Sequence, residues 1–188
     1  MKKFYVPDSM KDYIKIGKKI TYLLRHDSQD LIMDKNGYVS VVSLLNKIDI
    51  SQEELDHIVE TNDKKRLAYD LKKEKIRASQ GHSIKVDVQL KAVRPPRTLW
   101  HGTSLDNSDI IMRTDGLSKM RRLHVHLTDS KKTAYDVGKR YSRHEEPCIL
   151  EIDSAAMYAD GYKFYLSENG VWLTDNVPVK YIKKEKRY

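Results

Sequence analysis

The pattern of apolar and polar residues changes along the chain and predicts two kinds of structure. Before residue 26, apolar positions recur at helical spacing with lysines opposite, and Asp8 or Ser9 can cap a helix that ends near Arg25. Two shorter helices follow; Ser40 can cap one, and Ser51 opens a capping box for the other. The positions expected to face the core in the first two helices are Met10, Tyr13, Ile14, Gly17, Ile20, Thr21, Leu24, Val41, Val42, Leu44 and Leu45.

Between residues 67 and 90 the apolar residues alternate with polar ones. Two short alternating runs, 67–71 and 76–78, are separated by a charged turn and predict a β-hairpin. Three helices followed by a hairpin is the winged-helix arrangement, although no function follows from that fold alone. A further half-buried strand is expected over 84–90, where every second residue is apolar. The prolines of the segment 91–97, KAVRPPR, predict a linker.

Beyond the linker, strands and helices mix, which predicts an α+β fold with small mixed or antiparallel sheets. The first strand ends in His101-Gly102-Thr103, and Arg121-Arg122 open the next. An imidazole, a bare backbone, a hydroxyl and nearby guanidiniums suit a ligand that has phosphates and a flat ring. Strands are expected at 98–101, 123–128, 148–152, 162–166, 171–173 and 177–183, and helices at 105–114, 130–141 and briefly after Asp153.

Composition narrows the class of partner. The net charge of +8 is divided evenly, with 18 basic and 14 acidic residues in 1–93 and 17 basic and 13 acidic residues in 94–188. An even basic excess suits a polyanion, and a mildly basic solvated surface fits equally well. No apolar run approaches the roughly 18 residues of a membrane helix, and the first residues have no apolar leader. The lone Cys148 lies in an apolar run, so we expect it to pack in the core of a cytoplasmic protein.

Three polar clusters have a structural interpretation beside a chemical one. Arg25-His26 ends the first predicted helix, where cations suit the helix dipole without any ligand. The basic run 64–66 is typical of a solvated charged turn. Gly81 stands among four polar residues and permits a positive φ or a close backbone approach, although a turn with incidental polar side chains fits as well.

Signatures of other site types are missing. His124 and His126 share one face of a predicted strand, but neither a cysteine nor a carboxylate stands at ligand spacing, so no metal is expected. The chain contains neither a P-loop nor a Rossmann glycine motif. A dinucleotide would therefore require another architecture.

Six motifs occur in a fixed order across nearly the whole chain, and together they resemble the Tpt1/KptA family of RNA 2′-phosphotransferases. They are LLRH (23–26), NDKKRL (62–67), IRASQGHS (76–83), WHGT (100–103), GLSKMRRLHVHL (116–127) and NGVWL (169–173). The resemblance implies a winged-helix lobe for RNA phosphate at 1–93 and an ADP-ribosyltransferase-like NAD-binding lobe at 94–188. It also implies RNA with an internal 2′-phosphate, of the kind left by tRNA splicing, as the substrate. NAD⁺ is the implied co-substrate, no metal is expected, and nothing calls for more than a monomer.

The reaction implied by the resemblance has two steps. The RNA 2′-phosphate attacks the nicotinamide ribose and expels nicotinamide, and a ribose hydroxyl then attacks the phosphorus. The products are RNA with a 2′-hydroxyl and ADP-ribose 1″,2″-cyclic phosphate.

The family's catalytic arginine–histidine set falls on four residues of this chain. They are Arg25, His26, Arg66 and Arg122, the last because the family arginine stands five residues after Gly-Leu, here Gly116-Leu117. The implied cofactor-binding residues are His101, Gly102 and Thr103, with Gln80, Gly81, His82 and Ser83 from a family loop near the cleft.

Two positions depart from the family pattern, and two other functions remain open. Leu67 stands where an aromatic residue is common and Trp100 where tyrosine is common, and both keep an apolar side chain. An ADP-ribosyltransferase that modifies nucleic-acid ends or protein would stop after the first step. It would need a catalytic glutamate, for which 145–146 and Glu168 are unconvincing candidates. A winged-helix binder without catalysis is the other alternative.

Overall fold

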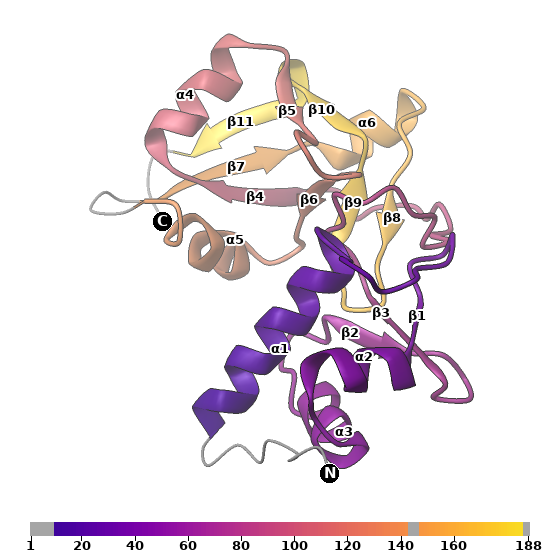
Figure 1. Cartoon of the computed structure of the whole chain (residues 1–188). Coiled ribbons are helices and arrows are strands. Elements are labelled where there is room, and N and C mark those ends of the chain that lie inside the picture. The colour runs from indigo at the N-terminus through magenta and orange to yellow at the C-terminus, as the bar shows by residue number, and fades with distance from the viewer. Residues whose placement is uncertain (1–9, 143–146, 186–188) are drawn as a thin grey trace. The chain divides into compact units, whose positions relative to one another are not determined.

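The computed structural model describes residues 10–142 and 147–185 and has a mixed α+β fold (Figure 1). The chain divides into two compact units, Met1–Gln89 and Leu90–Tyr188. Within the described ranges, no helix is both long and apolar enough to cross a membrane.

The first unit packs its helices beside one small sheet. The strands of that sheet lie in the order β1-β3-β2, and both pairings are antiparallel. The elements are α1 (Met10–Arg25), β1 (Val39–Ser40), α2 (Val41–Ile48), α3 (Gln52–Glu60), β2 (Leu67–Tyr69) and β3 (Lys75–Ala78). Three helices and a hairpin were expected, and the structure confirms them.

The helix caps confirm the local predictions for α2 and α3. The Ser40 hydroxyl accepts a hydrogen bond from the Ser43 amide at 3.4 Å. Ser51 and Glu54 form a reciprocal capping box, with the Ser51 amide donating to Glu54 Oε2 at 2.8 Å. Residues 8 and 9, the expected cap of α1, lie outside the described residues. The predictions that Ile14 and Val42 face the core were wrong, because these residues are 53% and 66% exposed.

The segment 84–90 is not a strand, and that prediction was wrong. Its apolar side chains are more buried than the polar ones between them, as alternation predicts. Its backbone, however, bonds to loops and a helix end, since the Ile84 amide donates to the Arg25 carbonyl and the Asp87 amide to the Lys35 carbonyl. The alternation therefore reflects which side of this extended segment is buried. It does not indicate that a second strand pairs with the segment.

In the described part of the second unit, the strands form three small antiparallel sheets. Their strand orders are β11-β7-β4, β6-β9-β8 and β10-β5. The elements are β4 (Leu99–Thr103), α4 (Leu105–Arg113), β5 (Gly116–Ser118), β6 (Val125–Leu127), α5 (Lys131–Gly138), β7 (Cys148–Ile152), α6 (Ser154–Ala159), β8 (Tyr165–Leu166), β9 (Trp172–Thr174), β10 (Asn176–Pro178), η1 (Val179–Tyr181) and β11 (Ile182–Glu185).

The predicted single strand over 177–183 was wrong, because the turn η1 divides it. β10 pairs with β5, and β11 pairs with β7, so the two pieces serve different sheets. The short strand β5 was not predicted at all. Strand β6, which was expected over 123–128, begins later, at Val125, and Arg121 and Arg122 therefore lie in the preceding turn.

Helix α5 packs directly on β4 at Gly102. Figure 1 shows α5 beside β4. A Cβ atom at Gly102 would lie 1.7 Å from the Ala134 carbonyl oxygen and 2.8 Å from the Gly138 amide nitrogen. Only glycine allows that approach, since atoms this close would overlap. Gly102 therefore sets the distance between the strand and the helix.

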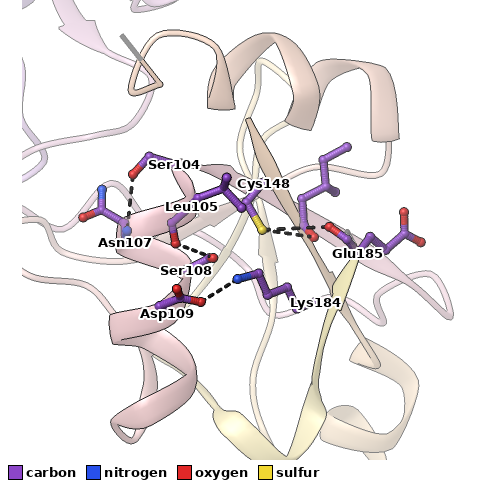
Figure 2. Close-up of polar contacts among 9 residues, drawn as sticks. Ser104, Leu105, Asn107, Ser108, Asp109, Cys148, Lys184 and Glu185 are labelled. Carbon is purple, nitrogen blue, oxygen red and sulfur yellow. Dashed lines mark hydrogen bonds and ion pairs between the residues drawn. The ribbon is translucent and has the colours of Figure 1, made fainter. Parts of the chain in front are cut away.

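Cys148 is structural, as the sequence predicted. Its side chain is buried, and its sulfur lies 3.9 Å from the Glu185 carbonyl oxygen, across the β7–β11 pair (Figure 2). The same view shows the start of α4, where the Asn107 amide donates to the Ser104 hydroxyl at 3.3 Å. An ion pair between Asp109 and Lys184 ties α4 to β11.

Candidate functional site

The C-terminal end of α1 holds the loop that follows β3. The Arg25 carbonyl accepts hydrogen bonds from the amides of Ser83 at 2.8 Å and Ile84 at 3.2 Å. His26 Nδ1 lies 3.0 Å from the Ser83 hydroxyl oxygen. A helix end leaves carbonyls without intrahelical partners, and here the loop supplies the donors. Arg25, His26 and Ser83 are consequently neighbours, although 57 residues separate His26 from Ser83.

Gly81 brings this loop against the Arg25 guanidinium. Its φ is +87°, and a Cβ atom there would lie 3.3 Å from Arg25 Cζ and 3.5 Å from Nη1. Both properties that the sequence suggested for Gly81, a positive φ and a close approach, are present. His82, next in the loop, is buried, and Gln80 is partly exposed.

Arg66 reaches the same region from the turn before β2. Its amide donates to the Asn62 side-chain oxygen at 3.3 Å, and its carbonyl accepts from the Ser79 amide at 2.9 Å. Lys65 takes a φ of +41°, which turns the chain just before the strand. Arg25 and Arg66 line one cavity of about 570 Å³ within the first unit.

In the second unit, His101 on β4 has a defined proton position. Its Nδ1 lies 3.0 Å from the His126 carbonyl oxygen, and because a carbonyl only accepts, Nδ1 carries the proton. Burial lowers the pKa of His101, the carbonyl raises it, and the charge on Arg122 lowers it, with a net pKa below the ordinary value of 6.5. The neutral ring thus keeps Nε2 as a hydrogen-bond acceptor.

His126 on β6 joins His101 to Arg122. Arg122 Nη1 lies 3.3 Å from His126 Nδ1, and a guanidinium can only donate, so Nδ1 of His126 accepts. His126 therefore accepts a hydrogen bond from His101 through its backbone carbonyl and one from Arg122 through its side chain. Sequence reasoning missed this role, because it considered His126 only as half of a metal pair with His124.

The remaining candidate residues differ in their surroundings. Gly102 accommodates α5, and Thr103 is only 5% exposed. Arg121 is exposed, and the His124 ring packs beside Tyr165 with 5.6 Å between ring centroids. Residues 145–146, considered as a catalytic glutamate, lie outside the described residues. In the part of the chain that is described, three His, Cys, Asp or Glu side chains do not gather anywhere as a metal site would require.

Comparison with known sequences defines the class of protein to which these clusters belong. A family model described as "RNA 2'-phosphotransferase, Tpt1 / KptA family" matches residues 11–176. The chain belongs to this family.

Curated relatives agree with that assignment along almost their whole length. A "Probable RNA 2'-phosphotransferase" of Flavobacterium johnsoniae is 49% identical over 174 residues, covering 89% of this chain and 93% of the relative. Proteins of the same name from Fusobacterium nucleatum and Nostoc punctiforme are 46% and 44% identical. Those alignments cover 93% and 91% of this chain, and 99% and 96% of the relatives.

Proposed function

We propose that the protein removes an internal 2′-phosphate from RNA by transferring it to NAD⁺. Membership of the RNA 2′-phosphotransferase family supports the RNA substrate. The observation that carries the proposal is the joint placement of Arg25 and Arg66 on one cavity, at a helix end where His26 is fixed by Ser83. We further propose that the protein is cytoplasmic and acts as a monomer.

Each unit has a proposed part in the reaction. The segment 1–93 acts as a winged-helix lobe that binds the RNA phosphate. The segment 94–188 acts as an ADP-ribosyltransferase-like lobe that binds NAD⁺. Three helices followed by a hairpin support the first assignment, and the small antiparallel sheets around His101 support the second.

Arg25, His26, Arg66 and Arg122 are the proposed phosphate ligands. A phosphomonoester carries nearly two negative charges and three strong acceptor oxygens at neutral pH. Guanidiniums keep their charge and bind such oxygens in pairs, so three of them both neutralise and orient the group. His26, held at Nδ1, presents its other ring nitrogen to the ligand.

NAD⁺ binding is assigned to His101 to Thr103, with residues 80–83 as further contacts. His101 can bind a ribose hydroxyl: its Nδ1 donates to the His126 carbonyl, so its Nε2 is free of a proton and accepts from the hydroxyl. Gly102 and Thr103 contribute through the backbone, since Gly102 has no side chain and that of Thr103 is buried.

In the first step, a phosphate oxygen forms a bond to the anomeric carbon of the nicotinamide ribose as the bond to nicotinamide breaks. Nicotinamide leaves as a neutral molecule, so no acid has to protonate it. Placing the phosphate oxygen against the carbon is therefore the main task of the arginines.

In the second step, the adjacent ribose hydroxyl attacks the phosphorus and the bond to the RNA 2′ oxygen breaks. The proton of that hydroxyl passes to the RNA oxygen, which leaves as a 2′-hydroxyl. Negative charge on the phosphoryl oxygens is stabilised chiefly by Arg122, whose guanidinium His126 positions.

Incubation with NAD⁺ and an oligonucleotide that bears one internal 2′-phosphate tests the proposal against its two alternatives. We expect nicotinamide and 2′-hydroxyl RNA in equal amounts. A stable ADP-ribosyl adduct would favour an ADP-ribosyltransferase that stops after the first step. Absence of nicotinamide, with RNA binding retained by Arg122→Ala, would favour a non-catalytic binder.

Arg122→Ala separates the two steps of the proposed reaction. Removal of one such charge-stabilising donor costs about 10²–10³ in rate in comparable sites. If Arg122 acts chiefly in the second step, an RNA 2′-phospho-ADP-ribosyl species should accumulate on a gel and in mass spectra. Equal slowing of nicotinamide release and RNA release, with no such species, would contradict that role.

A further inference from the structure

The cavity that holds Arg25 and Arg66 is larger than a phosphate requires. It follows one face of α1 from Tyr13 to Arg25, a length of about 18 Å at 1.5 Å per residue. Its volume, about 570 Å³, falls within the roughly 300–1,000 Å³ that small-molecule sites occupy. The cavity therefore extends along the helix beyond the side chain of Arg25.

The charge of the lining favours an anionic ligand along this length. Besides the two arginines, Lys18 of α1 and Lys64 of the following turn line the cavity, against one carboxylate, Asp63. Lys18 is exposed and lies seven residues, or about two helical turns, before Arg25. The cations are thus spread along the cavity, which suits a ligand with more than one phosphate.

The lining between the cations is partly apolar. Ile14 is 53% exposed, and Tyr13 packs its ring against His57 with 4.6 Å between centroids. Gly17 and Ile58 also line the cavity and pack closely, since a Cβ atom at Gly17 would lie 3.2 Å from Ile58 Cγ2. Apolar and aromatic surfaces beside cations are how proteins hold single-stranded bases without reading their sequence.

We propose that this α1 groove binds the nucleotide next to the phosphorylated one in single-stranded RNA. Lys18 and Lys64 contact its phosphodiester, and Tyr13 and Ile14 contact its base. This inference rests on the proposed function for the identity of the RNA. It adds that the enzyme prefers a 2′-phosphate within a chain to one on an isolated nucleoside.

Two neighbouring lysines of α1 provide a matched test. Lys18 lines the groove, whereas Lys19, also exposed, does not. The kcat/KM ratio is measured for a 2′-phosphorylated oligonucleotide over a nucleoside 2′-monophosphate. We expect Lys18→Ala to lower that ratio about five- to tenfold and Lys19→Ala to leave it at the wild-type value. Equal ratios for the two variants would overturn the proposal.

Binding without NAD⁺ tests the groove even if no phosphate transfer occurs. For single strands, each phosphate contact contributes about 0.7 to the slope of log Kobs against log salt. Fluorescence anisotropy with the labelled oligonucleotide should show a slope smaller by that amount for Lys18→Ala and unchanged for Lys19→Ala. Asp63→Asn should tighten binding about twofold, because it removes the only carboxylate of the lining.

Each outcome bears on one proposal or the other. Absence of transfer by the wild type, with the lysine pattern in binding intact, would refute the function and keep the groove. Displacement of the RNA by an acidic peptide at equal concentration would indicate a general anion surface and overturn the groove proposal.

Discussion

Substitution of Gly102 by alanine should destabilise the second unit, although the family resemblance assigns this glycine to NAD⁺. The new methyl carbon would lie 1.7 Å from the Ala134 carbonyl oxygen, 2.6 Å from its carbon and 2.8 Å from the Gly138 amide nitrogen. A carbon and an oxygen that are not bonded need more than about 3 Å between them. All three obstructing atoms belong to the backbone of α5, so no change of rotamer can relieve the overlap.

The expected size of the effect follows from this geometry. Overpacking a core against movable side chains costs about 1–3 kcal/mol, and occasionally more. Here a helix has to move away from β4 by more than 1 Å, so we expect a cost of about 3 kcal/mol or more. For a domain of about 100 residues, 1 kcal/mol lowers Tm by roughly 4–8 °C. The transition of the second unit should therefore fall by more than about 12 °C.

Gly170→Ala is a matched control, since its site combines a positive φ of +75° with open space around the missing Cβ. Backbone strain alone should cost that variant about 1 kcal/mol. Calorimetry of the wild type and both variants gives the comparison, with the KM for NAD⁺ measured at a temperature where all are folded. If Gly102→Ala raised that KM and kept a wild-type Tm, the packing explanation would be refuted.

Two predictions concern the histidines of the second unit. Because the pKa of His101 is lowered in the folded protein, the unfolded state binds the proton more readily, so this residue's contribution to stability falls as pH drops below about 6.5. Urea titrations between pH 7.5 and 5.5 should show a smaller loss of unfolding free energy for His101→Asn than for the wild type. His126→Ala removes a hydrogen bond to an exposed Arg122, worth about 1 kcal/mol, and should slow RNA release about fivefold. His124→Ala, on the same segment, is the control, and an equal effect of both variants would contradict the positioning role.

The sequence predicted the helix caps and the glycine turn correctly, because these features depend on residues that are close together in the chain. Ser40 and Ser51 cap their helices because a side-chain hydroxyl three residues before an amide can reach it. Gly81 takes a positive φ at the position where the sequence allowed it. Such features depend on a few neighbouring residues, and a single sequence contains them in full.

Features that depend on distant partners could not be predicted. Residues 84–90 alternate like a strand, yet no pattern within them tells whether a second strand lies alongside. The division of 177–183 depends on β5 and β7, which are far apart in sequence. The requirement for glycine at position 102 comes from the close packing of α5. The role of His126 comes from its hydrogen bonds with His101 and Arg122. The residue types gave no sign of either contact.

The fate of the phosphorus atom tests the central claim most directly. The measurement uses RNA with a radioactive internal 2′-phosphate, incubated with the protein and NAD⁺, and follows the label by chromatography. Transfer to NAD⁺ predicts label in ADP-ribose 1″,2″-cyclic phosphate, in proportion to the nicotinamide released and only when NAD⁺ is present. Label released as inorganic phosphate without NAD⁺ would mean that water accepts the phosphoryl group, and would contradict the account.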